Sequence, residues 1–298
     1  MEPYVLVFDV GTSSLKAVLY DKTGAVIGLE QSRYEYQTPA PRWAETDPWD
    51  WLDGLWKCLD AMSDSYDLHK VEAISFTGQM HTVVMLDEGL EPLSPTILWL
   101  DRRAEAETLE LSQRFGLPPY VLNSTYSLPK IYWIHRNRPE QMKKTKTILW
   151  AKDYLRFAMT GRVATDATEG IGAALLDWGT GEWAAQRLVD IGVSPDILPE
   201  MLPANAVAGA LHAPVAEKYG FDPLPSDAIF FSFMFVLADA IERAGVADRA
   251  AIASVIRSTK GLDSVLGPLA SDEKGEMVHT ATIFQNVGKV AKPLERVG

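Results

Sequence analysis

Polar residues suited to a phosphate and its metal ion follow an apolar stretch near the start of the chain. Asp9 ends the string V-L-V-F-D, and Gly11, Thr12 and Ser13 come just after it. A carboxylate at the end of a strand can hold a hydrated Mg²⁺. A glycine lets the backbone turn sharply, and nearby hydroxyls and N–H groups suit phosphate oxygens. We therefore expect Asp9 to assist a metal ion, with Gly11, Thr12 and Ser13 along the phosphate path.

The same turn fits neither of two common nucleotide-binding motifs. The sequence contains no G-x-x-x-x-G-K-[ST] loop. The dinucleotide-binding fingerprint is excluded because a strand pattern, rather than a helix, follows the turn. Taken by itself, D-x-G-T is equally consistent with an ordinary hairpin that has a polar turn.

A second set of polar residues lies between two predicted strands. Residues 71–76 have the pattern of a buried strand, Gln79, Met80 and His81 follow, and residues 82–87 form the next strand. Loops between rigid strands often carry function. Gln79 can both donate and accept hydrogen bonds, and His81 can do either with the hydroxyl of a polyol. A single histidine in a loop is more often structural, so the loop alone leaves both interpretations open.

The elements that must position these loops follow from hydrophobic periodicity. Residues 4–10, 14–20 and 25–34 read as three strands joined by tight turns, which predicts an antiparallel meander. A helix over residues 48–62 is expected next, because an Asp-Pro pair precedes apolar residues at helical spacing. The chain is therefore predicted to be α/β, with its polar turns at the ends of strands.

Composition narrows the class of protein. The 298 residues carry a formal net charge of -12, which argues against broad binding to nucleic acids. No apolar run is long enough to span a bilayer, and the first residues lack the pattern of a signal peptide. Cys58 is the only cysteine, so we expect no intrachain disulfide and inert packing of its thiol. The expectation is a cytoplasmic protein without nucleic-acid or membrane partners.

Longer strings carry a resemblance to one enzyme family. They are D-V-G-T-S-S-L-K-A-V-L-Y at 9–20, G-Q-M-H at 78–81, L-W-L-D-R-R at 98–103, and K-D-Y-L-R with T-G-R-V-A-T-D within 152–166. Over residues 4–225 the chain resembles the N-terminal domain of the FGGY carbohydrate kinases, and within them the xylulokinases. The resemblance implies a ribonuclease H-like (actin-like ATPase) α/β fold, with residues 1–227 as the kinase domain.

The reaction that the resemblance implies is phosphoryl transfer from ATP, assisted by Mg²⁺, to a hydroxyl of a small sugar. Gln79, Met80 and His81 would then frame the sugar. The G-Q-M-H string favours a ketopentose such as xylulose, and a gluconate-like sugar acid is the alternative.

Further strings of the same resemblance add candidates. Asp101 is expected to cap a helix that begins at residue 102, and Arg103 would hold the loop on the sugar side. With Gln79, Met80 and His81, both are candidates for binding the sugar that the resemblance implies. Leu100 stands where relatives usually carry a polar residue. Lys130 lies in the first turn of another predicted helix, where it either faces the site or is a solvated lysine.

Two features of complete sugar kinases have no recognisable counterpart. In those enzymes a strand ending in Gly-x-x-Asp supplies the general base, and a second domain supplies the adenosine loop. Asp227 lacks this glycine context, so the base role is not assigned to it. We therefore expect little or no kinase activity from the chain alone, with a non-catalytic sugar-binding or interaction module as the alternative. An uncovered cleft surface would favour a homo-oligomer or a complementing chain.

The tail, residues 228–298, resembles a different protein. V-L-A-D-A-I-E-R-A-G at 236–245, a second helix at 249–259 and a last strand at 278–287 resemble the C-terminal segment of a periplasmic binding protein of the branched-chain amino-acid type. This resemblance predicts a mosaic joined near residues 226–229. A solute-binding fragment is therefore a third candidate function.

Overall fold

The computed structural model describes residues 4–118, 121–204 and 206–221, together with the backbone of short strands between residues 227 and 297. The chain divides into two compact units, Met1–Asp21 with Val26–Phe230 and Lys22–Ala25 with Phe231–Gly298. The candidate residues named above all lie in the first unit, which is described first.

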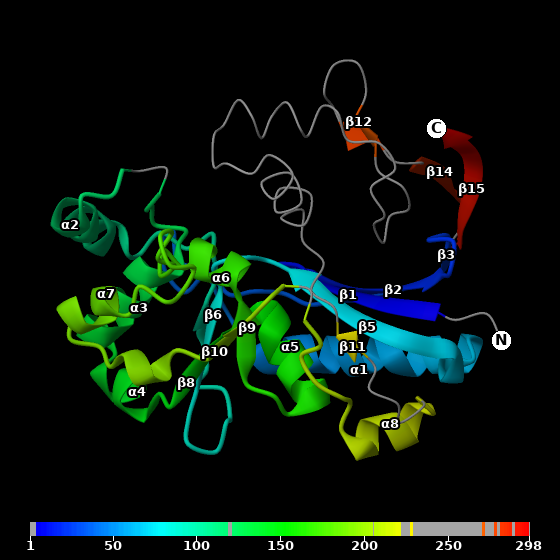
Figure 1. Cartoon of the computed structure of the whole chain (residues 1–298), viewed down its shortest axis with the longest axis horizontal. Coiled ribbons are helices and arrows are strands. Elements are labelled where there is room, and N and C mark those ends of the chain that lie inside the picture. The colour runs from blue at the N-terminus through cyan, green and yellow to red at the C-terminus, as the bar shows by residue number, and fades with distance from the viewer. Residues whose placement is uncertain are drawn as a thin grey trace. The chain divides into compact units, whose positions relative to one another are not determined.

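A five-stranded sheet forms the centre of the first unit (Figure 1). Its strands, in spatial order, are β11 (Asp227–Ala228), β5 (Val71–Gly78), β1 (Tyr4–Val10), β2 (Ser14–Asp21) and β3 (Val26–Arg33). The first three strands in sequence pair antiparallel, which confirms the predicted meander. Strands β5 and β11 run parallel to β1, so β1 and β5 both end on the same side of the sheet.

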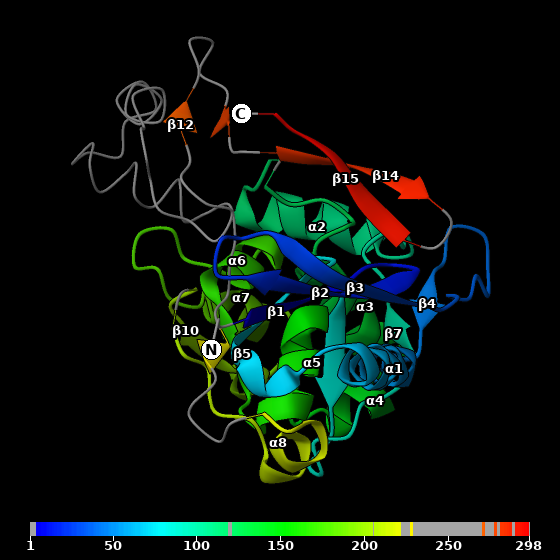
Figure 2. The same ribbon diagram turned by 90° about the vertical axis from the view of Figure 1, so that its right-hand side faces the viewer.

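Two helices cover one face of this sheet. They lie below the sheet in Figure 1, and Figure 2 shows the same arrangement from the side. Helix α1 (Pro48–Ser65) contacts β2 and β3, and α5 (Ala151–Thr160) contacts β1 and β5. The predicted start of α1 is confirmed, because the side chain of Asp47 accepts a hydrogen bond from the Trp49 N–H. Cys58 is buried in the core between α1 and the sheet, as expected for inert packing.

A second hydrophobic cluster lies around strands β6 (Val83–Leu86) and β8 (Thr147–Trp150), which pair antiparallel. The remaining helices are α2 (Glu105–Phe115), α3 (Ser127–Asn137), α4 (Pro139–Lys144), α6 (Ala167–Gly172), α7 (Gln186–Asp190) and α8 (Ala213–Tyr219), with 3-10 turns η1 (Leu68–Lys70) and η2 (Pro195–Ile197). The short strands are β4 (Glu45–Thr46), paired with β7 (Thr96–Ile97), and β9 (Ala164–Asp166), paired with β10 (Glu200–Leu202). No helix among the described residues combines the length and apolar character of a membrane span.

The second unit comprises the turn Lys22–Ala25 and, in its C-terminal part, the strands that the structure describes. Strands β12 (Ala270–Ser271) and β13 (Met277–Val278) pair antiparallel, as do β14 (Ala281–Val287) and β15 (Val290–Val297). The last pair agrees with the predicted strand that ends at residue 287. The helices predicted at 236–245 and 249–259 lie outside the described residues.

Candidate functional site

The two polar turns lie side by side because the strands that precede them are neighbours. Val10 pairs with Gly78 at the ends of β1 and β5, and the Gln79 N–H donates to the Val10 carbonyl oxygen at 2.8 Å. The backbones of β1 and β5 can come this close only because residue 78 is a glycine. A Cβ at Gly78 would lie 2.4 Å from Val10 Cγ1 and 2.5 Å from Val10 O. The two polar loops that follow β1 and β5 therefore lie together at one end of the sheet and form a single candidate site.

We expect Gly78→Ala to lower the free energy of unfolding by about 1–3 kcal/mol, because the added carbon overpacks a backbone contact. Urea denaturation measures the change. Gly54→Ala is the matched control, since in α1 the nearest atoms to its added Cβ are 3.5 Å away. That control should gain up to about 1 kcal/mol from helix propensity. Equal stability of Gly78→Ala and the wild type would contradict the close approach of the two strands.

The carbonyl oxygen of Gly11 joins the first turn to the second. It accepts hydrogen bonds from Tyr34 Oη at 2.7 Å and from Gln79 Nε2 at 3.1 Å. The Gly11 N–H donates to Ser14 O at 2.9 Å, which closes the turn. These bonds hold the turn from both sides, while Ser13 is exposed.

Asp9 lies at the base of this turn. It is half-buried on β1 between Lys16 of β2 and Thr77 of β5. Burial raises the pKa of Tyr34, and the negative charge of Asp9 raises it further, which places the carboxylate near that phenol. Among the described residues no donor is hydrogen-bonded to Asp9. The carboxylate is therefore available to a metal ion, and the adjacent hydroxyl-bearing turn fits a phosphate.

The second turn, Gln79–His81, is held from beneath by Thr82. The Thr82 hydroxyl donates to Gln79 Oε1 at 3.1 Å and accepts from the Trp99 N–H at 3.0 Å. Met80 is 42% exposed, whereas Gln79 is buried and His81 is half-buried. The loop thus presents one apolar and one imidazole side chain at the end of β5.

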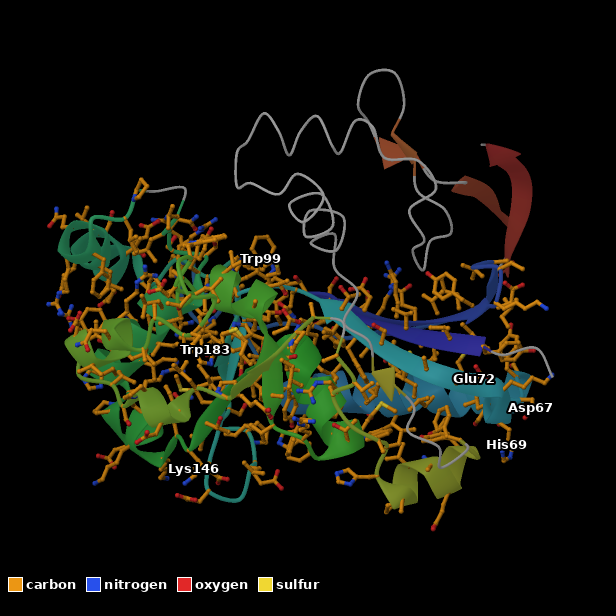
Figure 3. The ribbon with its side chains drawn as sticks, in the orientation of Figure 1. Asp67, His69, Glu72, Trp99, Lys146 and Trp183 are labelled. Atoms are coloured by element: carbon orange, nitrogen blue, oxygen red, sulfur yellow. The ribbon has the colours of Figure 1, made fainter. Side chains whose placement is uncertain are left out.

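Trp99 connects the two turns, a role that the sequence analysis missed. Its indole Nε1 donates to Thr12 Oγ1 at 2.9 Å, and 37% of its surface is exposed. Figure 3 labels Trp99 among the side chains of the first unit. The Trp99 backbone oxygen accepts from Lys130 Nζ at 3.1 Å. A large aromatic residue between a short strand and a helix start was the available signal. Two alternatives were open for Lys130, and the solvated one is wrong, since only 2% of this residue is exposed.

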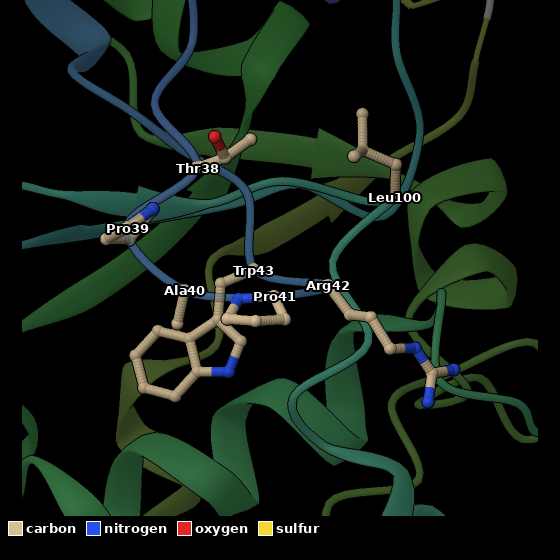
Figure 4. A pocket seen from close by; sticks show the side chains of 7 residues that line it. All are labelled: Thr38, Pro39, Ala40, Pro41, Arg42, Trp43 and Leu100. Carbon is tan, nitrogen blue, oxygen red and sulfur yellow. The ribbon is translucent and has the colours of Figure 1, made fainter.

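Leu100, next to Trp99, lines a hollow of about 470 Å³ (Figure 4). The other lining residues are Thr38, Pro39, Ala40, Pro41, Arg42 and Trp43. Apart from Thr38 and Arg42, the residues that line this hollow are apolar.

Asp101 and Arg103 form a buried ion pair. Arg103 Nη2 lies 2.7 Å from Asp101 Oδ2, its Nη1 lies 2.6 Å from Glu45 Oε1, and its guanidinium stacks 3.7 Å from the Trp43 ring centre. The prediction that Asp101 caps a helix from residue 102 is wrong. Helix α2 begins only at Glu105, and its N-cap residue is Ala104, which has no side-chain acceptor. The Asp101 carboxylate accepts from the backbone N–H and the guanidinium of Arg103 and from the Ala44 N–H. Both side chains therefore serve this internal network, which fixes the chain around Trp99.

Asp227 lies at the far end of β5 from this site. Strand β11 pairs Asp227 with Ala73, five residues before Gly78. At about 3.3 Å per residue, that register separates the backbone of Asp227 from the turns by roughly 16 Å along the strand. This placement agrees with leaving the base role unassigned.

Comparisons with known proteins complete the description of the site. The model of the "FGGY family of carbohydrate kinases, N-terminal domain" matches residues 4–227. The xylulose kinase of Lactococcus lactis subsp. lactis (strain IL1403) is 31% identical over 281 residues, which cover 92% of this chain and 55% of that protein. The xylulose kinase of Escherichia coli (strain K12) is 31% identical over 221 residues, covering 73% and 46%. The chain thus spans about half the length of these curated relatives.

Solved structures show the same fold. The crystal structure of a xyloylose kinase from Brucella ovis superposes with a TM-score of 0.70 at 28% identity, covering 74% of this chain and 46% of that one. The fold is the ribonuclease H-like, actin-like ATPase fold that the sequence predicted. The resemblance of the tail to a periplasmic binding protein is not supported. The match to the xylulose kinase of Lactococcus lactis covers 92% of this chain, so it must include residues beyond 227.

Proposed function

The chain belongs to the FGGY family of carbohydrate kinases, and on that premise we propose that it forms the sugar-binding, phosphate-facing half of an ATP-dependent kinase for a xylulose-like ketopentose. The observation that carries the proposal is the joining of the two turns. The Gly11 carbonyl accepts from Gln79, and the Thr12 hydroxyl accepts from Trp99. A phosphate turn and a sugar loop in direct contact are what transfer between ATP and a hydroxyl requires.

Each candidate residue has a defined part in this proposal. Asp9 would hold Mg²⁺ at the phosphates, and Gly11, Thr12 and Ser13 would offer donors to phosphate oxygens. Bound MgATP would supply the phosphoryl group and the charge that neutralises it. Gln79, Met80 and His81 would orient the sugar so that one hydroxyl points toward the phosphate turn. Asp101 and Arg103 would act only through the loop that they support.

The division of the chain is part of the same proposal. Residues 1–227 would be the kinase domain, and residues 228–298 a separate tail. The proposed kinase would obtain its general base and adenosine loop from a complementing chain, and self-association through the uncovered cleft surface is proposed beside it. A cytoplasmic location, where ATP and free sugars are present, is proposed with it. Light scattering tests self-association, and a monodisperse monomer would contradict a homo-oligomer.

The kinase activity of the purified 298-residue chain is tested by measuring xylulose-dependent release of ADP from ATP in the presence of Mg²⁺. We expect little or no turnover above that of an Asp9→Ala variant, because Asp227 is far from the turns. Binding of xylulose without turnover would support a non-catalytic sugar-binding module or a half-enzyme that needs a partner. Turnover that disappears in Asp9→Ala would show instead that the chain is a working kinase with another base.

A further inference from the structure

The backbone of His81 adopts a conformation that needs support from its surroundings. Its φ of +70° lies in the left-handed region, which residues with a side chain rarely occupy. Such a conformation persists where neighbouring contacts over-determine it, and it is frequent in ligand-binding loops. The contacts around His81 therefore indicate what the loop is built to present.

Two segments hold His81 in place. Ser127, the first residue of α3, donates from its hydroxyl to the His81 carbonyl oxygen at 3.0 Å. The Tyr126 ring packs on the imidazole with its centre 4.8 Å away. On the other side, His81 Nδ1 lies 2.6 Å from the carbonyl oxygen of Gly172, the last residue of α6. Both the backbone and the ring of His81 are thus fixed.

The bond to Gly172 determines how the imidazole can interact with a ligand. A carbonyl oxygen can only accept, so Nδ1 must carry the hydrogen. Burial lowers the pKa of His81; the bond to Gly172 opposes this shift, and the charge of Lys130 adds to it. The carboxyl group of Glu169 also faces the backbone amide of His81. A neutral ring with its hydrogen on Nδ1 leaves a lone pair on Nε2.

We propose that helix α6 fixes His81 as a hydrogen-bond acceptor at Nε2, with Gly172 as the positioning residue, so that the loop selects a substrate hydroxyl over a carboxylate oxygen at that point. This inference rests on the proposed sugar-binding function and deepens it. A hydroxyl can donate to Nε2, whereas a carboxylate oxygen would place its lone pairs against the lone pair of the ring. The loop should therefore accept a hydroxyl, and not a carboxylate, at Nε2.

Gly172 is needed at the contact because the space beside it is filled. An added Cβ would lie 3.0 Å from His81 Nδ1 and 3.1 Å from Met80 Cε. Gly170, two residues earlier in α6, is a matched control. Its added Cβ would also meet tight contacts, at 3.3 Å, but with Leu176 and Trp183 rather than with the loop.

Nitrogen NMR of the full chain labelled with ¹⁵N-histidine tests the tautomer. The chain has five histidines, and a His81→Gln variant identifies the signal of His81. We expect a protonated Nδ1 and an unprotonated Nε2 in the wild type at pH 7. Gly172→Ala should shift the Nδ1 signal or mix the tautomers, while Gly170→Ala should leave both nitrogens unchanged. A protonated Nε2 in the wild type would overturn the inference, whether or not either variant folds.

Titration with two small compounds separates this inference from the proposed function. D-xylulose is expected to move the Nε2 signal, and acetate, which offers a carboxylate without a hydroxyl, is expected to leave it in place at the same concentration. An equal shift with both compounds would overturn the selection of a hydroxyl. No shift of any loop signal with D-xylulose would overturn the proposed function and the selection together, while the tautomer result would still decide the role of Gly172.

Discussion

Asp101→Ala is expected to lower the free energy of unfolding by about 3–5 kcal/mol, because it leaves a buried guanidinium without its main partner. Asp101 is 0% exposed, and the side chain of Arg103 is 1% exposed. The substitution also removes the acceptor of the Ala44 N–H. Glu45 would remain beside Arg103, but it already pairs with Arg138 at 2.5 Å. Urea denaturation followed by circular dichroism measures the loss.

Glu105→Ala is the control for this measurement. It breaks the Arg42–Glu105 pair, whose side chains are 63% and 50% exposed, and should cost at most about 1 kcal/mol.

Sugar binding by Asp101→Ala decides between two roles for Asp101. A loss of sugar binding in an Asp101→Ala variant of wild-type stability would show that Asp101 contacts the ligand, which contradicts the structural role.

The second large effect concerns Lys130 and pH. Burial lowers the pKa of Lys130 to about 7; the charge of Asp101 opposes this shift, and Arg102 and Arg103 add to it. Within the described part of the chain, its ammonium group is bonded only to the Trp99 and Thr125 carbonyl oxygens, at 3.1 and 2.6 Å. In the unfolded chain a lysine keeps its proton up to a pH of about 10.4. Between pH 7 and 10 the unfolded state therefore binds more protons, and stability rises with pH.

We expect the free energy of unfolding of the wild type to rise with pH relative to that of Lys130→Met, by about 1 kcal/mol per pH unit between 7 and 10. Below pH 7 the two curves should run parallel, since both states are then protonated. Lys57→Met is the control, because Lys57 is 65% exposed in its pair with Asp53. Curves of wild type and Lys130→Met that stay parallel up to pH 10 would contradict a lysine buried behind Trp99.

The sheet and its first helix could be predicted because their signals are local. Strands β1, β2 and β3 have alternating or continuous apolar patterns with tight turns between them, and α1 has its cap and proline within two residues. The Gln79–His81 loop follows directly from the end of β5. The structure brings it to the Gly11–Ser13 turn because β1 and β5 are parallel neighbours, a pairing that the sequence analysis did not predict.

The parts that could not be predicted depend on partners far away in sequence. Asp101 accepts from the Arg103 N–H, as its local sequence suggests, but the helix begins only at Glu105. The same carboxylate also binds the Ala44 amide, 57 residues earlier, which no local pattern indicates. Trp99 reaches Thr12 across 87 residues, and no periodicity signals such a bond. The burial of Lys130 likewise depends on the loop of Trp99, which packs over it. For the tail, family resemblance alone carried the prediction, and the comparisons do not support it.

Binding of D-xylulose to the purified chain, measured by isothermal titration calorimetry, tests most directly whether the two turns form a sugar site. We predict saturable binding to the wild type and a loss of at least about tenfold in affinity, or 1.4 kcal/mol, for His81→Ala. His135→Ala, which changes a histidine of α3 outside the site, should bind as the wild type does. A folded wild-type chain that does not bind D-xylulose, or equal binding by His81→Ala, would contradict the proposed site.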